Sequence, residues 1–473
     1  MMSYSYLGIV MAALAVLIAM IWQFCWNVLW RPYALTKSFE KQGIKGPPYN
    51  IFYGSLREME SLRKAAYEMI LDTNCNDISQ KVLPYFHKWS AEYGEVFLYW
   101  RGLHPTIAIE DPEIARQVFK SGFFVKPEMP PTLLAFGGLG LGQLNGQDWV
   151  RHRTILNPAF TVEKLKVMTK TFAALTIDMI DNWKNKALIA GQQSITIQVS
   201  EEFKKLTSDI IAHIAFGSSY AEGMEAFKAQ KELERHCLAT STNIYVPGNQ
   251  FLPTPSNLRM WKLEKKVKNS LSRIILGRIE SESTANLLSW TIFLLSLHQE
   301  WQERVREEVL RECGMGIPEA DVLTKLKEVN MVLLETLRLY GAVMDTDREA
   351  AKDMKIGNLM IPKGVRVTIQ FVKIHRSKEY WGDDANEFNP LRFKNGVSQA
   401  ARHPNAFIAF GFGSRGCIGQ NLAMLEMKMV LSLLLQQFSF SLSPEYKHAP
   451  ANHLTLQPQY GVPVIVKPFL LSK

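Results

Sequence analysis

The chain has 473 residues, of which 47% are hydrophobic and 21% are charged, and its formal net charge is +9. Low-complexity runs and internal repeats are absent, so the length is compatible with one large enzyme core as well as with several domains. The net charge fits a protein that lies against anionic lipid and meets an acidic partner, but it equally fits an ordinary solvated surface.

The cysteines exclude a disulfide scaffold. They are odd in number and scattered without paired spacing, which fits a reducing compartment. The five positions are Cys25, Cys75, Cys237, Cys313 and Cys417.

The N-terminal segment, residues 1–30, is predicted to anchor the chain in a membrane. Leu7–Trp30 is uncharged and mostly apolar, and it is long enough to cross a hydrocarbon core as a helix. A cleaved signal peptide is the alternative, but the run is too long for one, lacks a basic region ahead of it and ends in Asn-Val-Leu-Trp. Basic residues follow the run and none precedes it, so the rest of the chain is expected on the cytosolic side. These residues are Arg31, Lys37, Lys41 and Lys45.

Residues 31–48 are expected to form a linker, because Gly46-Pro47-Pro48 is a stiff break that a helix does not tolerate. Residues 49–473 are then one domain. Alternating segments predict strands, and apolar residues at helical spacing predict long helices, so the expected fold is mainly α with small β sheets. The expected strands are Glu95–Gly102, Pro105–Glu110 and pieces within Ile356–Gln370 and Leu454–Val466. The expected helical regions are Pro112–Lys120, Val162–Trp183, Val199–Phe216 and Glu300–Leu339, with another opened by Asp148.

Phe410–Gly419, Phe-Gly-Phe-Gly-Ser-Arg-Gly-Cys-Ile-Gly, is the most informative segment. A cysteine thiolate that ligates haem iron needs a tightly folding backbone, free N–H groups and a cation for a propionate, and this segment supplies glycines and Arg415 around Cys417. A buried structural thiol is the alternative. The stretch also contains Gly-x-Gly-x-x-Gly, but the βαβ unit that a dinucleotide site requires does not surround it.

This segment resembles the haem loop of the cytochrome P450s, Phe-x-x-Gly-x-Arg-x-Cys-x-Gly, at Phe410, Gly413, Arg415, Cys417 and Gly419. The likeness runs from about Lys45 to the C-terminus and is greatest to plant microsomal members near the cytokinin and fatty-acid hydroxylases. It implies a haem-thiolate fold with haem b, whose iron Cys417 ligates. It also implies a single-pass protein of the endoplasmic reticulum membrane that uses O2 and electrons from a separate NADPH-dependent flavoprotein reductase. The expected substrate is a lipophilic small molecule of hormone, fatty-acid or terpenoid type, and no nucleic acid partner is expected.

The resemblance also assigns further residues. Trp149, Arg153 and Arg348 match positions that contact the haem propionates, for which guanidinium groups are suited. Glu335 and Arg338, three residues apart on one helical face, would ordinarily form a weak surface pair. With Arg392 they match a buried triad that holds the haem loop.

The resemblance also suggests residues that contact the substrate, although core or loop packing explains each of them equally well. These candidates are residues 130–142, Val343, Met344 and Tyr460–Val462. Arg402, Arg415 and Lys428 are candidates for docking the reductase.

One piece of the family pattern is missing. The central helix of the family carries Ala-Gly-x-Glu-Thr-Thr, and the matching register here is Ile279–Thr284. Glu282, Ser283 and Thr284 are the candidates for relaying protons to bound oxygen. Bulky Ile279 and Glu280 stand where the family has small residues, and the first half of the helix is absent, which predicts an internal deletion near residues 279–284.

Few helix breakers occur in Leu263–Arg311, which predicts one overlong helix there. Three functions stay open at this point. The chain is a haem-dependent monooxygenase, a haem-binding but catalytically impaired truncated isoform, or a membrane-anchored interaction protein without haem.

Overall fold

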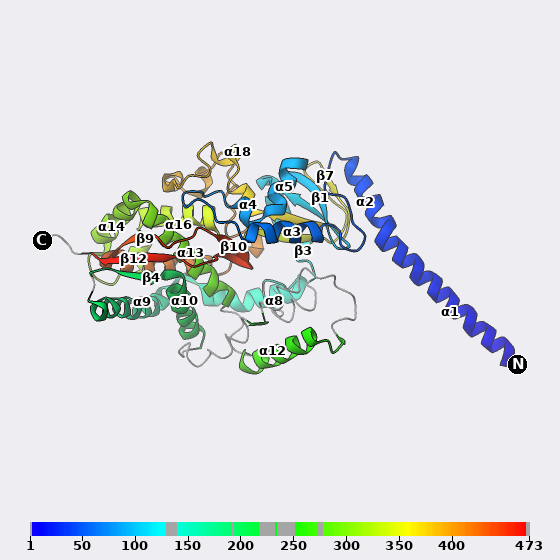
Figure 1. The fold of residues 1–473 in the computed structure, drawn as a ribbon, viewed down its shortest axis with the longest axis horizontal. Helices are drawn as coiled ribbons and strands as arrows, with labels where there is room; N and C mark the ends of the chain where they lie inside the picture. The colour runs from blue at the N-terminus through cyan, green and yellow to red at the C-terminus, as the bar shows by residue number, and fades with distance from the viewer. Residues whose placement is uncertain are drawn as a thin grey trace.

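The structure is a computed structural model, and it describes residues 2–128, 140–191, 193–216, 232–233, 251–271 and 278–469. It is mostly helical with small sheets, as the sequence predicts. A long helix at the N-terminus projects from the body of the molecule (Figure 1).

The projecting helix consists of α1 (Met2–Cys25), a π-helical turn (Trp26–Trp30) and α2 (Arg31–Glu40). Among the described residues, one helix, Gly8–Glu40, is both long enough and apolar enough to cross a membrane. The protein does not bury its apolar part. Residues 31–40, which we expected to be linker, are therefore helical. The wider π turn just before Pro32 explains this, because proline cannot donate the backbone hydrogen bond of a regular helix interior.

The end of the projecting helix is fastened to the body. Phe39 is fully buried, and the Gln42 side chain accepts from the Met360 backbone N–H and donates to the Met360 carbonyl. The backbone N–H of Leu98 donates to the Lys45 carbonyl at 2.9 Å. A Cβ at Gly46 would lie 1.7 Å from the Leu98 carbonyl oxygen, so only glycine fits there.

We expect Gly46→Ala to lower the free energy of unfolding by about 1 to 3 kcal/mol, because the new methyl group forces the backbone away from Leu98. Gly122→Ala is the matched control, since a Cβ there meets no atom within 4 Å. Urea unfolding of the full chain in detergent measures both. If both substitutions lowered the free energy of unfolding equally, the close contact between Gly46 and the Leu98 backbone would be contradicted.

The largest sheet has five strands in the order β1-β2-β8-β5-β3. β1 and β2 form an antiparallel hairpin, β2 and β8 are parallel, and β5 is antiparallel to both β8 and β3. Helix α6 (Pro112–Lys120) follows β2, and Asp111 caps it by accepting from the Ile114 backbone N–H at 2.7 Å. The predicted strands and helix of this region are confirmed. The strands are β1 (Val96–Arg101), β2 (His104–Ile109), β3 (Phe124–Val125), β5 (Asp345–Ala350) and β8 (Arg366–Gln370).

The smaller sheets lie elsewhere in the domain. A three-stranded sheet has the order β4-β12-β9, and β6-β7 and β10-β11 are two-stranded. The bounds are β4 (Ile195–Gln198), β6 (Met354–Ile356), β7 (Leu359–Ile361), β9 (Phe438–Leu442), β10 (Pro450–His453), β11 (Thr455–Pro458) and β12 (Pro463–Pro468).

The helical part of the domain surrounds α13 (Arg278–Leu297), which packs against α10 and α16. Trp290 and Phe293 of α13 are fully buried, and the Trp290 ring stacks on Tyr340 at 4.5 Å. The other main helices are α3 (Leu56–Tyr67), α5 (Pro84–Tyr93), α8 (Gly146–Leu156), α9 (Val162–Ala190), α10 (Val199–Phe216), α12 (Pro255–Leu271), α14 (Gln299–Cys313), α16 (Lys327–Tyr340) and α19 (Gln420–Gln437).

The prediction of one helix across Leu263–Arg311 is wrong. The chain leaves the helix at His298, where φ is −105° and ψ is 78°, and α14 starts at the next residue. The side chain of Gln299 stabilises this turn, because its amide donates to the carbonyls of Ser296 and Phe440. Residues 272–277, between α12 and α13, lie outside the described residues.

Candidate functional site

The Cys417 loop, residues 410–419, turns tightly before α19. The backbone N–H of Cys417 donates to the Phe410 carbonyl at 2.9 Å. The backbone N–H of Gly416 donates to the Gly413 carbonyl at 3.0 Å, which closes a second turn. Gly411 and Gly413 both have φ of 70°, a conformation that favours glycine. The Cys417 side chain is exposed and stands close to the N-terminus of α19, where a helix dipole favours negative charge.

Helix α8 is joined to the Cys417 loop by the residues that the sequence singles out. Arg153 donates to the Gly416 carbonyl at 3.0 Å, and the Arg415 guanidinium lies 4.7 Å from the centre of the Trp149 ring. Arg415 also donates to the Asn145 side-chain oxygen at 3.1 Å. Burial lowers the pKa of Arg415. No residue of α8 is buried, so these contacts tie the helix to the loop.

Arg348 approaches the same loop from β5. It is 4% exposed and donates to the Thr346 hydroxyl at 3.1 Å and to the Asp347 carbonyl at 2.8 Å. Burial, reinforced by the charge of Arg415, lowers the pKa of Arg348 to about 10. In the described part of the chain, neither Arg348 nor Arg415 forms an ion pair with a carboxylate. The two guanidinium groups therefore lie near each other, and the Asp347 carboxylate, which favours the charged form of Arg348, forms its ion pair with Arg101.

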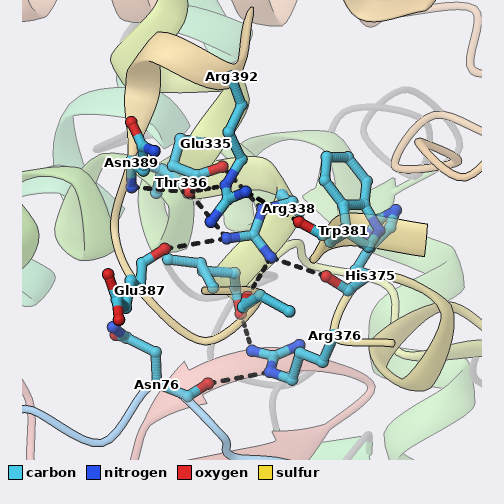
Figure 2. Close-up of polar contacts among 12 residues, drawn as sticks. Asn76, Glu335, Thr336, Arg338, His375, Arg376, Trp381, Glu387, Asn389 and Arg392 are labelled. Carbon is cyan, nitrogen blue, oxygen red and sulfur yellow. Dashed lines mark hydrogen bonds and ion pairs between the residues drawn. The ribbon is translucent and has the colours of Figure 1, made fainter. Parts of the chain in front are cut away.

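The arginine brace (Glu335, Arg338 and Arg392) is buried, as the resemblance leads us to expect (Figure 2). Arg338 donates two hydrogen bonds of 2.7 Å to the two carboxylate oxygens of Glu335, and both side chains are fully buried. Arg392 lies 3.5 Å from Glu335 and 2.6 Å from Asp384. Arg338 also donates to three backbone carbonyls, so its donors are used inside the protein. These belong to His375, Ala385 and Glu387.

His375 connects the brace to the Cys417 loop, and no pattern in the sequence marks it. Its carbonyl accepts from Arg338, and its Nε2 accepts from the backbone N–H of Ile408 at 3.0 Å, two residues before the loop. The ring also stacks on Phe407 at 5.6 Å. Burial, with the charges of Arg338 and Arg376, lowers the pKa of His375 to about 3, so the ring is a neutral acceptor. Sequence reasoning missed this residue because only the fold brings position 375 beside position 408.

The expected proton-relay residues lie in the first turns of α13. Glu282 accepts a hydrogen bond of 2.9 Å from Gln457 of β11, and Gln457 accepts in turn from Lys204 at 3.1 Å. Ser283 is half-buried and Thr284 is buried. The next turns are also bound to the β10-β11 hairpin, since Asn286 donates to Thr455 and Trp290 to the Leu456 carbonyl. The side chains of Ile279 and Glu280 lie outside the described residues.

The remaining candidates are divided. Met344 and Val462 are buried core residues, whereas Val343 and Tyr460 are exposed. Most of the expected substrate loop, namely residues 130–139 of 130–142, lies outside the described residues. Arg402 is exposed, and burial lowers the pKa of Lys428.

Removing the carboxylate charge of the brace is expected to be costly. Glu335→Gln leaves the buried Arg338 charge unpaired, so the free energy of unfolding should fall by about 3 to 5 kcal/mol. Glu40→Gln, which disrupts the exposed Lys37–Glu40 pair, should change it little. Chemical unfolding of both variants measures the contrast, and a near-neutral Glu335→Gln would show that the pair does not stabilise the fold.

Because the pKa of His375 is lowered in the folded protein, we expect the protein to lose stability in acid. An unfolded histidine titrates near pH 6.5, whereas the folded pKa is about 3, so the unfolded state binds the proton and stability falls as pH drops below about 6.5. His375→Gln keeps an acceptor for Ile408 but does not titrate. Its thermal midpoint should therefore fall less than that of the unmodified chain between about pH 7 and pH 4. Parallel curves would contradict the assignment, because His448, whose pKa burial lowers to about 4, is present in both proteins.

Comparisons with known proteins bear on this site. A family model described as "Cytochrome P450" matches residues 73–283 and 280–466. Cytochrome P450 709B3 of Arabidopsis thaliana is 47% identical over 95% of this chain and 96% of that protein. Cytochrome P450 734A1 of Arabidopsis thaliana is 37% identical over 92% of each chain. Cytochrome P450 CYP72A616 of Paris polyphylla is 37% identical over 92% of this chain and 94% of that protein.

The family match is interrupted at the start of α13, since its two segments meet at residues 280–283. The alignments with these three relatives are 499, 483 and 488 positions long, more than the 473 residues of the chain. Each alignment therefore contains positions of the relative that have no counterpart here.

The family match covers most of the chain on both sides of this interruption, and the relatives align almost end to end. The matched region includes the Cys417 loop, the arginine brace and the helices between them. The chain therefore belongs to the cytochrome P450 family of haem-thiolate monooxygenases.

Proposed function

We propose that this protein is a membrane-anchored monooxygenase that inserts one oxygen atom into a lipophilic small molecule, and that the Cys417 sulfur would hold the iron of a haem. The observation that carries the proposal is the junction of the Cys417 loop with Arg348 and Arg415. An exposed sulfur at a helix N-terminus lies on the same loop as a cation that has no carboxylate partner among the described contacts. A dianionic, iron-containing porphyrin satisfies both requirements.

The residues present fit that group. Arg348 and Arg415 would bind its carboxylates, while Trp149 and Arg153 of α8 hold Arg415 and the loop backbone in position. Phe410, Gly413 and Gly419 shape the loop that carries Cys417. Bound haem would supply the redox-active iron at which dioxygen is reduced for transfer to the substrate. The brace and His375 would keep the loop backbone from shifting.

Proton delivery is assigned to α13. We propose Glu282 as the acid, with Ser283 and Thr284 as the alcohols that pass its proton. Gln457 donates to Glu282 Oε1 at 2.9 Å, which orients the carboxyl group. The β10-β11 hairpin thus positions this turn of the helix.

Electrons would come from a separate NADPH-dependent flavoprotein reductase. Arg402 and Lys428 supply positive charge for an acidic partner, and Arg402 is exposed. We place the protein in the endoplasmic reticulum membrane with its catalytic domain in the cytosol, because Arg31, Lys37 and Lys41 follow the apolar helix.

A second candidate function is haem binding without efficient turnover. The interruption of the family match at residues 280–283 favours it, because it falls where the central helix of the family carries its small residues. Sequencing the transcript across the codons for Arg278–Asn286 would show whether the interruption belongs to the gene product.

Replacing the proposed ligand tests the main proposal. Carbon monoxide added to the reduced protein should give the red-shifted Soret band of a thiolate complex, and Cys417→Ser should abolish it. Cys313→Ser, which changes a thiol on α14, is the control and should keep the band. An unchanged spectrum in Cys417→Ser would overturn the assignment. NADPH-dependent product formation with a reductase would exclude the second candidate.

A further inference from the structure

Lys204 of α10 is joined to the first turn of α13, although no motif includes it. Its ammonium group donates to Gln457 Oε1 of β11 at 3.1 Å, and Gln457 Nε2 donates to Glu282 Oε1 at 2.9 Å. These two hydrogen bonds join positions that are 253 and 175 residues apart along the chain. A lysine on one helix is therefore linked to a carboxyl group on another helix through a single amide.

The Gln457 amide has one orientation that suits its neighbours. An ammonium group only donates hydrogen bonds, so the atom that it meets must be the amide oxygen. The NH2 group then faces the other way, where Glu282 Oε1 and the His453 carbonyl, 3.2 Å from the same nitrogen, each accept a hydrogen bond. Lys204 thus helps to decide that the carboxyl group of Glu282 faces a donor and not an oxygen atom.

The β10-β11 hairpin does not need Lys204 to stay against α13. The Asn286 amide donates to the Thr455 hydroxyl at 3.1 Å, and the Trp290 indole N–H donates to the Leu456 carbonyl at 3.4 Å. Asn286 and Trp290 are buried, and they lie about one and two helical turns beyond Glu282. The contribution of Lys204 is therefore local, because it acts on the orientation of one amide.

The line from Lys204 to Glu282 is only partly open to solvent. The side chains of Lys204, Gln457 and Glu282 are half-buried, so their charges are screened less than those of an exposed pair. The cation lies at the oxygen end of the amide and the carboxyl group at the nitrogen end, so the two hydrogen bonds polarise the amide in the same sense and strengthen each other. Lys205, the next residue of α10, is exposed and offers a matched comparison.

We propose that Lys204 is a positioning residue for proton delivery. Through the Gln457 amide it holds the carboxyl group of Glu282 in the orientation from which Ser283 and Thr284 receive its proton. The inference rests on the proposed function, because it takes Glu282 as the acid. Lys204 itself transfers no proton in this scheme, since its part is to fix the amide that Glu282 faces.

Peroxide release without substrate is the first test. Reduction of O2 to peroxide takes two electrons and two protons, whereas reduction to two molecules of water takes four of each, so poor proton delivery favours peroxide. The full chain, loaded with haem in detergent, is supplied with NADPH and reductase, and peroxide is counted per NADPH consumed. We expect Lys204→Met and Glu282→Gln each to raise this ratio by about threefold or more. Lys204→Arg keeps a charged donor and should leave the ratio unchanged, as should Lys205→Met.

Gln457→Glu separates orientation of Glu282 from support of the hairpin. The new carboxylate keeps a partner for Lys204, but it has no N–H for Glu282 and repels the charge of that side chain. If Lys204 acted only by holding the hairpin in place, Gln457→Glu would leave the peroxide ratio unchanged, and that result would overturn the inference. We expect the ratio to rise as far as it does in Lys204→Met.

Unfolding gives a second readout that does not depend on turnover. The urea midpoints of Lys204→Met, Glu282→Gln and the double variant form a cycle, and the shifts should not add, because the two residues act on the same amide. Additive shifts would overturn the inference, and so would a peroxide ratio that rises in Glu282→Gln but not in Lys204→Met. An unchanged ratio in Glu282→Gln would overturn the proposed role of Glu282, and this inference with it. Circular dichroism verifies that each variant is folded.

Discussion

The fully buried ion pair between Arg338 and Glu335 is the constraint on which the site depends. Two charges without solvent are tolerated only when their hydrogen-bonding groups are satisfied, and here Arg338 uses its donors on Glu335 and on three backbone carbonyls. Those carbonyls belong to the segment 375–387, which must keep one conformation. The His375 ring in turn accepts a hydrogen bond from the backbone N–H of Ile408, which fixes the chain just before the Cys417 loop.

The brace and the two cations beside the Cys417 loop (Arg348 and Arg415) both use arginines that are buried or half-buried, but for different roles. In the brace, Glu335 and Asp384 are the acidic partners of Arg338 and Arg392, so the charges balance, which suits a structural role. Beside the loop, the described contacts of Arg348 and Arg415 are with a hydroxyl, an amide oxygen and a backbone carbonyl, and neither guanidinium forms an ion pair with a carboxylate in the part of the chain that the structure describes. A protein retains such repulsion where an anionic ligand is to bind, because the ligand then relieves it.

Helix α13 is held along its length by contacts with the rest of the domain. Its C-terminal part is held by packing, with Trp290 stacked on Tyr340 and Phe293 stacked on His448. Its N-terminal part is held by hydrogen bonds to β11 through Glu282 and Asn286. The contacts that hold the Cys417 loop and the arginine brace do not involve residues 280–283, where the two segments of the family match meet.

Local chemistry in the sequence was enough to identify the Cys417 loop, the apolar N-terminal helix, the β1-β2 hairpin and α6, because glycine placement, hydrophobicity and alternation act over a few residues. The continuation of the N-terminal helix past Pro32 and the break at His298 were missed, because a π turn accommodates the proline and the distant Phe440 carbonyl stabilises the break. His375 and Asn145 carry no signal of their own. Their contacts with Ile408 and Arg415 join positions that are 33 and 270 residues apart along the chain. Only the tertiary structure brings these residues together, because burial and charge act through space and not along the sequence.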